Sequence, residues 1–284
     1  GHDRVGVAVL VFGHRGACGY LPENTMESLE LAFELGADAI EFDVVMTKDH
    51  RAVICHDREL NLVTNIGDKA FLSQRVDELR FEDIQQLRAL ERYPEGRPDS
   101  HQHSGEFPIP SLRDVLANPA FDGKHLIIEL KYGEPFLEAG LDVAKAAADE
   151  IFASTVFERG IKITMECFEF EILKRAKTLM GDAVDYVFLA APDTLPVGDS
   201  EITDEYLATI RANFDGLSVA IPMVLQSDLV SRTKALGMPI YAYTARTETA
   251  EGDVSGWFQR LIATGVDGIF ADQPDQLIKV RDAL

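Results

Sequence analysis

The chain has 284 residues, 46% of them hydrophobic and 26% charged, which suits one large α/β domain or two small ones. Its net charge of −21, from 48 acidic and 27 basic residues, disfavours nucleic acid and anionic membranes as partners. Its apolar runs are shorter than the roughly 20 residues that a membrane span needs, so we expect no stable membrane association. The three cysteines lack CxxC or metal-type spacing, and we expect free thiols.

Short apolar runs rich in β-branched residues alternate with helical patterns along most of the chain. The runs predicted as strands are Val7–Gly13, Ala39–Val45, Leu126–Lys131, Lys162–Cys167, Tyr186–Ala190, Gly216–Val219, Ile240–Thr244 and Gly268–Ala271. A first helix is expected after Asn24, which is predicted to cap it with Glu27 in a capping box. The later predicted helices are Glu134–Ser154, Phe170–Met180, Asp204–Phe214, Leu225–Leu236 and Ser255–Thr264.

This βα alternation predicts an α/β fold, a (β/α)8 TIM barrel formed by residues 1–284 as a single domain. An open doubly wound sheet is the alternative, which the lack of a G-x-G-x-x-G motif after the first strand disfavours. Residues 61–108 break the alternation, because they are polar and carry several prolines. We interpret them as an insertion over the C-terminal rim of the barrel, with a short helix near Val76–Leu90.

The second predicted strand carries Glu41 and Asp43, which alternation places on one face. Two like charges at a strand end are costly unless a cation joins them. The apolar run at 52–57 follows too soon for a crossover helix, so a hairpin after this strand is expected. If residues 48–49 form a two-residue turn, His56 lies opposite Glu41, although one residue of slip would break this pairing.

A second charged pair, Glu129 and Lys131, ends the strand predicted at 126–131. The carboxyl ends of barrel strands converge on one mouth, so side chains distant in sequence should meet there. The residues expected at this mouth are His14, Arg15, Glu41, Asp43, His56, Glu129 and Lys131.

The three carboxylates among them make an all-oxygen site suited to Mg²⁺ or Ca²⁺ rather than to zinc. Two histidines can act as acid and base near neutral pH. Arg15 and Lys131 supply the positive charge that the surface lacks. A metal ion, two histidines and two cations together favour attack on a phosphodiester.

Several short motifs along the chain form a recognisable series. They are His14-Arg15-Gly16, Pro22-Glu23-Asn24-Thr25, Glu41-Phe42-Asp43, His56-Asp57, Ile128-Glu129-Leu130-Lys131, Cys167-Phe168 and the run at 265–274. In this order they resemble the glycerophosphodiester phosphodiesterase family over nearly the whole chain. The resemblance implies hydrolysis of glycerophosphodiesters to glycerol 3-phosphate and an alcohol such as choline or ethanolamine. It also implies that the glycerol hydroxyl next to the phosphorus can attack, through a cyclic phosphate.

The resemblance further implies roles for individual residues. One divalent ion, Mg²⁺ or Ca²⁺, would be held by Glu41, Asp43 and Glu129. His14 and His56 would act as the acid/base pair, and Arg15 and Lys131 would hold the phosphate. Phe168 and Tyr243 are expected on the substrate-binding wall.

The strand near residue 243 departs from the family pattern. Many members carry Trp-Thr-x-Asn there, whereas this chain has Tyr243-Thr244-Ala245-Arg246, so we expect a smaller aromatic wall. Arg246 would either meet the phosphate or extend to solvent. Asp272 is interpreted as a helix cap before Pro274. Similarity to the exported bacterial branch favours the periplasm or the exterior over the cytoplasm.

Other functions remain possible on the same barrel. A lysophospholipase D or another lipid phosphodiesterase is the nearest alternative, although the polar insertion offers no obvious apolar rim. An aldolase would use Lys131 as a Schiff-base lysine. A phosphate-binding barrel without turnover is a third alternative, which the histidines and carboxylates disfavour. We expect a small-molecule substrate, and the sequence leaves the oligomeric state open.

Overall fold

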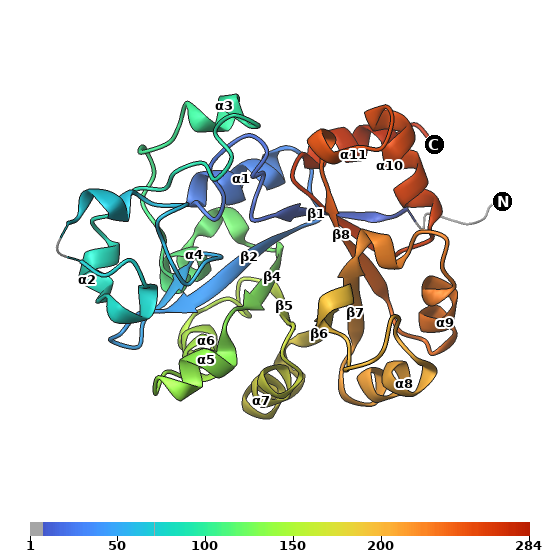
Figure 1. The fold of residues 1–284 in the computed structure, drawn as a ribbon. Helices are drawn as coiled ribbons and strands as arrows, with labels where there is room; N and C mark the ends of the chain where they lie inside the picture. Colours follow the sequence, from blue (N-terminus) through green and yellow to red (C-terminus); the bar gives the residue numbers. More distant parts are fainter. Residues whose placement is uncertain (1–7, 71) are drawn as a thin grey trace.

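The strands of the computed structural model, which describes residues 8–70 and 72–284, form a closed barrel (Figure 1). The strand β1 (Leu10–His14) pairs in parallel with both β2 (Ala39–Met46) and β9 (Gly268–Ala271), which closes the sheet. The other parallel strands are β4 (His125–Leu130), β5 (Lys162–Cys167), β6 (Asp185–Ala190), β7 (Gly216–Ala220) and β8 (Ile240–Ala245). The predicted (β/α)8 barrel is confirmed, and the open doubly wound sheet is excluded.

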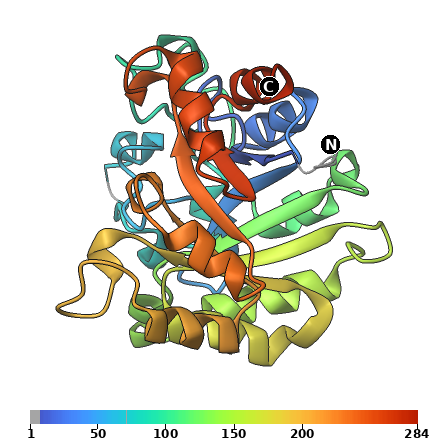
Figure 2. The same cartoon turned by 90° about the vertical axis from the view of Figure 1, so that its right-hand side faces the viewer.

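Helices surround the outside of the strands, as Figures 1 and 2 show. They are α1 (Met26–Glu34), α4 (Leu112–Ala117), α5 (Gly133–Glu138), α6 (Val143–Ala153), α7 (Phe170–Met180), α8 (Asp204–Asn213), α9 (Leu229–Ala235), α10 (Val254–Ala263) and α11 (Pro274–Asp282). The helix predicted at Glu134–Ser154 is two helices, because Gly140 adopts φ +79° between them and Asp142 caps α6. Among the described residues, no helix combines the length and apolar character that crossing a membrane requires.

The barrel interior is filled by a layer of aromatic and aliphatic side chains. Phe12 lies against Phe270 and Tyr241, with ring centroids 4.9 and 5.4 Å apart, and Ile127 packs with them. This packing is typical of the inward-facing layers of such barrels. It gives the polar groups at the carboxyl ends of the strands an apolar floor.

The predicted hairpin after β2 is confirmed, but its register is wrong by one residue. The strand β3 (Ala52–Ile54) pairs antiparallel with β2, with Val44 opposite Ile54. The turn has three residues rather than two, and the third, His50, adopts φ +63°, as three-residue hairpin loops require. As a result the backbone of Cys55, not of Ile54, bonds to that of Asp43.

The segment at 61–108, whose boundaries as an insertion stay a prediction, contains only short helices in its described part. They are the 3₁₀ helices Asn65–Asp68 and Val76–Glu78 and the α-helices α2 (Phe81–Ile84) and α3 (Pro98–His101). The single helix predicted near Val76–Leu90 is therefore wrong. An extended backbone at Leu79 ends the first turn, and α2 starts afresh after Arg80. In Figure 1, α3 lies above α1 at the top of the view, and α2 lies at the left edge beyond α4.

One histidine of the barrel provides a test of the interior packing. His125, at the start of β4, bonds through Nε2 to Thr164 Oγ1 at 2.8 Å and lies edge-on to Phe12. Burial, helped by the charge of Lys162, lowers the pKa of His125 from 6.5 to about 4. At a pH between these two pKa values, His125 is protonated in the unfolded chain but not in the folded chain.

We therefore predict that His125 contributes a loss of stability as the pH falls from 6.5 to about 4. The variant His125→Gln keeps a hydrogen-bonding group and should lose less stability than the wild type across this range. Thermal unfolding followed by circular dichroism at several pH values measures the difference. Parallel stability curves for the two proteins would contradict the packing described here.

Candidate active site

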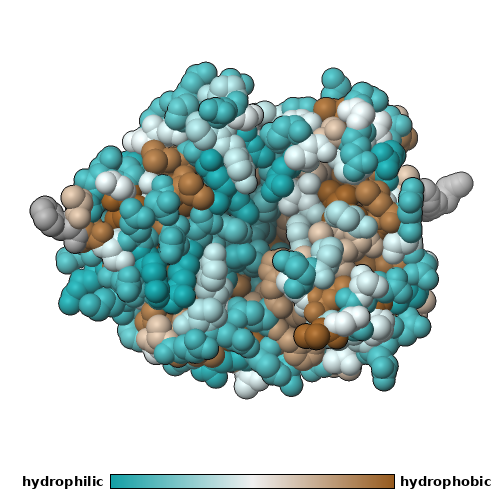
Figure 3. Space-filling view, in the orientation of Figure 1, coloured by the Kyte–Doolittle hydropathy of each residue, from teal (hydrophilic) through white to brown (hydrophobic). Residues whose placement is uncertain are grey.

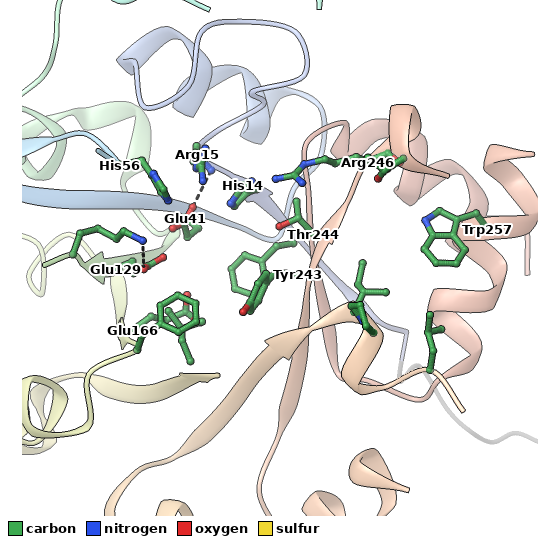
Figure 4. Close-up of a pocket in the computed structure, with 18 of the residues that line it drawn as sticks. His14, Arg15, Glu41, His56, Glu129, Glu166, Tyr243, Thr244, Arg246 and Trp257 are labelled. Atoms are coloured by element: carbon green, nitrogen blue, oxygen red, sulfur yellow. Dashed lines mark hydrogen bonds and ion pairs between the residues drawn. The ribbon is translucent and has the colours of Figure 1, made fainter. Parts of the chain in front are cut away.

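The predicted site residues meet at a cavity of about 440 Å³ at the carboxyl ends of the strands (Figures 3 and 4). Those that line it are His14, Arg15, Glu41, His56, Glu129, Lys131, Phe168 and Tyr243. The remaining one, Asp43, is fully buried beside Glu41 and Glu129. The structure therefore brings together every residue that the sequence placed at the mouth.

Three carboxylates form the centre of the site. Glu41, Asp43 and Glu129 each offer an oxygen within 4.8 Å of the others, and their exposed fractions are 2%, 0% and 8%. They gather because β2 lies between β1 and β4, with Asp43 directly beside Glu129. Among the described residues, Asp43 Oδ1 has no hydrogen-bond partner. An all-oxygen set with an unpartnered buried oxygen fits a hard divalent cation.

The pKa values of these carboxyls reflect the crowding. Burial and the neighbouring Asp43 raise the pKa of Glu41 well above its usual value. Burial, opposed in part by Lys131, raises the pKa of Glu129 to about 7. Burial also opposes ionisation of Asp43, but the charges of His56, Arg15 and Lys131 outweigh it and lower the pKa of Asp43. Among the three, Asp43 is therefore the carboxyl whose ionised form its neighbours favour most.

The turn after β1 places one cation against this cluster. Arg15 adopts φ +51°, donates its backbone N–H to Glu41 Oε1 at 2.9 Å, and holds Nε 3.5 Å from Asp43 Oδ2. The next residue, Gly16, has φ +86°, and a Cβ there would lie 2.5 Å from the backbone of Ser28. The His-Arg-Gly sequence thus follows from a tight turn that only glycine can complete.

The second cation comes from the loop after β4. Lys131 Nζ lies 3.0 Å from Glu129 Oε2, within ion-pair distance but outside hydrogen-bond geometry. It also lies 5.6 Å from the ring centroid of Phe168. Burial opposes the charge of Lys131, yet Glu129 and Asp43 raise its pKa above the usual value. Lys131 is therefore a permanent cation at the mouth.

Each histidine of the site has a carboxylate on its Nδ1. His14 bonds to Asp272 Oδ1 and His56 to Asp57 Oδ1, both at 2.7 Å. Burial lowers the pKa of His14 below its usual value despite Asp272, which favours the neutral imidazole. A carboxylate on Nδ1 favours the tautomer that leaves Nε2 able to accept a proton. Burial opposes ionisation of Asp57, but bonds from His56 and Arg92 lower its pKa to about 2.

The contacts of Asp272 correct one prediction from the sequence and show where Arg246 lies. The N-cap of α11 is Gln273, whereas Asp272 is 1% exposed and bonds to His14 and two arginines, so the capping interpretation is wrong. One of those arginines is Arg246, whose Nε lies 2.8 Å from Asp272 Oδ2. The sequence left Arg246 to meet the phosphate or to extend to solvent. The structure pairs Arg246 with Asp272 and places it in the cavity lining, and its contact with a phosphate stays a prediction.

The far side of the cavity is apolar. The rings of Phe168 and Tyr243 pack edge to face at 6.1 Å, and the Tyr243 hydroxyl donates to Ala190 O at 2.9 Å. Beyond them the wall consists of Leu189, Ile221, Pro222, Leu225 and Trp257. Figure 3 shows hydrophilic groups on one side of the central hollow and hydrophobic groups on the other, and Figure 4 places Trp257 away from the carboxylates.

Comparison with known proteins identifies the family. The model of the glycerophosphoryl diester phosphodiesterase family matches residues 14–276. The chain belongs to this family. It is 28% identical to a glycerophosphodiester phosphodiesterase of Bacillus altitudinis, over 96% of this chain and 98% of that protein. The family and the phosphodiesterase class expected from the sequence are confirmed.

Solved structures of the same family name share the fold. A Silicibacter pomeroyi DSS-3 protein that carries the name superposes with a TM-score of 0.79 at 25% identity, covering 97% of this chain and 94% of the other. An Oleispira antarctica phosphodiesterase, solved with the product sn-glycerol-3-phosphate, superposes with a TM-score of 0.74 at 22% identity, covering 97% of each chain. The barrel is therefore the fold of this family.

Two residues of the candidate site, Asn24 and Glu166, were not predicted as site residues from the sequence. Asn24, predicted as a helix cap, adopts φ +57°, and Thr25 caps α1 instead. The Asn24 amide donates to Asp43 Oδ2 at 3.0 Å, and its oxygen accepts from the Asp43 backbone N–H at 3.2 Å. Glu166 of β5 lies beside Glu129 in the barrel register, is 2% exposed and lines the cavity. Burial and Glu129 raise its pKa well above the usual value.

Sequence patterns could have predicted only one of these two residues, Glu166. Glu166 lies one strand along from Glu129 and ends a run whose alternation points every second side chain inward, so period-two reading of β5 finds it. No local sequence pattern predicts the role of Asn24, because its partner Asp43 is brought close only by the pairing of β1 with β2. A short polar residue that tolerates positive φ fits both requirements at this position.

Removing the Asn24 side chain should destabilise the folded protein. The variant Asn24→Gly keeps the positive φ without strain but leaves two buried polar groups of Asp43 without their partners. We expect a loss of about 1–3 kcal/mol in the free energy of unfolding. Urea denaturation in EDTA measures it. A change within about 0.5 kcal/mol, as at an ordinary surface position, would contradict this role.

Proposed function

We propose that the chain hydrolyses glycerophosphodiesters to glycerol 3-phosphate and an alcohol, using one divalent ion, Mg²⁺ or Ca²⁺. The observation that carries this proposal is the buried group of Glu41, Asp43 and Glu129, set between two cations and two histidines. Membership of the family and the relative's name support the reaction. The substrate is a small molecule that enters the cavity of about 440 Å³.

Glu41, Asp43 and Glu129 would hold the ion, and the unpartnered Asp43 Oδ1 would be one of its ligands. When bound, the ion supplies Lewis-acid stabilisation of charge on the phosphoryl oxygens. Arg15 and Lys131 bind the non-bridging oxygens of the phosphate. Their charges act in a largely buried site, where preorganised donors stabilise a transition state most effectively.

His14 and His56 carry the protons. One accepts the proton of the attacking hydroxyl, and the other gives a proton to the departing alcohol. In the route that family resemblance favours, the glycerol hydroxyl next to the phosphorus attacks and forms a cyclic phosphate, which water then opens. Asp272 and Asp57 support these roles, because each keeps its histidine in one tautomer and one orientation.

A lysophospholipase D or another lipid phosphodiesterase is the second candidate. The apolar wall of Ile221, Leu225 and Trp257 favours it, because this wall offers a contact for an acyl or alkyl group. The aldolase alternative is disfavoured. A Schiff-base lysine needs a lowered pKa, whereas the neighbouring carboxylates raise that of Lys131.

The reaction is tested by release of glycerol 3-phosphate from glycerophosphocholine. We expect release that EDTA abolishes and that Mg²⁺ or Ca²⁺ restores. A parallel assay of choline release compares lysophosphatidylcholine with glycerophosphocholine, and the second candidate predicts faster choline release from the lipid. A folded protein that releases nothing from glycerophosphocholine with either ion would contradict the proposed reaction.

The histidine roles are tested by His14→Ala and His56→Ala. Each should lower kcat by at least about 100-fold, the usual contribution of a general acid or base, while binding of glycerol 3-phosphate persists. His101→Ala is the matched control, because His101 is exposed and contacts only Ser104 through its ring nitrogen among the described residues. A His14 or His56 variant with wild-type kcat would refute acid–base catalysis by that residue.

A further inference from the structure

Residues 91–100, here called the brace, lie in the polar segment before α4 and contact both histidines of the site indirectly. Arg92 Nη2 donates to Asp57 Oδ1 at 2.8 Å, and Asp57 holds His56. Arg97 Nη2 donates to Asp272 Oδ2 at 2.5 Å, and Asp272 holds His14. Each histidine therefore ends a histidine–carboxylate–arginine chain, and both arginines belong to the same short segment.

Both arginines also bond to groups other than the carboxylates that hold the two histidines. Arg97 is 8% exposed and donates to Cys18 O at 3.0 Å and to Glu248 at 3.2 and 3.3 Å. Arg92 donates to Glu23 at 3.0 and 3.2 Å. Glu23 in turn accepts from Arg15, the cation beside Asp43. The brace is thus joined to the strand ends that carry the site.

The brace is itself held in shape by internal hydrogen bonds. The buried carboxylate of Glu91 accepts from the Ser100 hydroxyl at 2.6 Å and from the Tyr93 backbone N–H at 2.8 Å. The Arg97 backbone N–H donates to Tyr93 O at 2.8 Å. Because the loop is fixed at both ends, its two guanidinium groups have little freedom to follow a carboxylate that moves.

The physical need for these arginines lies in the burial of the carboxylates. Burial opposes ionisation of Asp272, but His14 and Arg97 are among the groups that lower its pKa well below the usual value. A carboxylate accepts along several directions, so a single bond to a histidine does not fix its orientation. A second, charge-assisted bond restricts the carboxylate further: Arg97 donates to the other oxygen of Asp272, and Arg92 donates to the same oxygen of Asp57 that His56 contacts.

We propose that Arg92 and Arg97 are positioning residues for the two histidines, each fixing the carboxylate that orients one imidazole. This inference rests on the proposed acid–base roles of His14 and His56. Asp272 has a second arginine partner, Arg246, whereas among the described residues Arg92 is the one arginine paired with Asp57. Loss of Arg92 should therefore cost more than loss of Arg97.

The experiment compares kcat and KM for Arg92→Ala and Arg97→Ala. A misplaced catalytic group costs up to about 100-fold in rate, so we expect kcat to fall about 10- to 100-fold, more for Arg92. For Arg97→Ala the KM should stay near the wild-type value, because Arg97 does not line the main cavity. Arg75→Ala is the matched control. Arg75 lies in the same polar segment at 61–108 but outside the brace, and it pairs with the carboxylate of Asp77, which contacts neither histidine. Its kcat should be unchanged.

Two readouts separate positioning from a merely structural role. Guanidinium added to Arg97→Ala should restore part of kcat and should not restore Asp272→Asn. In the double variant Arg97→Ala with Asp272→Asn, the arginine change should add little to the loss caused by the asparagine, because both act through one chain of contacts. If an alanine variant does not fold, Arg92→Lys and Arg97→Lys should still lower kcat, because lysine keeps the charge but lacks the planar guanidinium that bridges two carboxylates here.

These experiments distinguish failure of the positioning proposal from failure of the proposed function. Active His14→Ala and His56→Ala variants would overturn the acid–base assignment and this inference with it. Inactive histidine variants combined with wild-type kcat in folded Arg92 and Arg97 variants would overturn the inference alone. Additive losses in the double variant, without rescue by guanidinium, would also overturn it, since the arginines would then act independently of the carboxylates.

Discussion

The burial of four carboxylates at one end of the barrel is the constraint on which the rest of the structure depends. Glu41, Asp43, Glu129 and Glu166 are each at least nine-tenths buried, in a region where isolated charges are very costly. Lys131 and Arg15 offset part of this charge, while burial is the main cause that raises the pKa values of the three glutamates. The proposed divalent ion supplies the missing charge, and its presence would also explain why an anionic phosphate enters a chain of net charge −21.

The strand ends and the loops contribute different parts of this site. The parallel strands fix where the carboxylates lie, because neighbouring strands in a closed barrel keep one register. The loops then supply the groups that orient them: Asn24 on Asp43, and the brace on the partners of the two histidines. A rigid scaffold with orienting contacts from loops is the arrangement that precise catalytic geometry requires.

The sequence predicted the barrel and the seven charged and histidine residues at its mouth because both depend on local patterns: period-two alternation and polar pairs at strand ends. Phe168 and Tyr243 were expected from the family resemblance alone. It failed where position depends on backbone detail or on distant contacts. The hairpin register followed from a positive φ at His50, which a Lys-Asp dipeptide does not signal. Asp272 matched a helix-cap pattern, yet its partners lie up to 258 positions away in the chain. Arg92 and Arg97 stood in a polar segment without any periodicity.

The most direct test of the account is the metal stoichiometry of the folded protein. Protein stripped with EDTA would be titrated calorimetrically with Mg²⁺ and with Ca²⁺, alongside a variant that combines Glu41→Gln with Glu129→Gln. The account predicts one ion bound per chain for at least one of the two metals, and no such binding by the variant. Folded wild-type protein that binds neither ion, or a variant that binds as the wild type does, would contradict it.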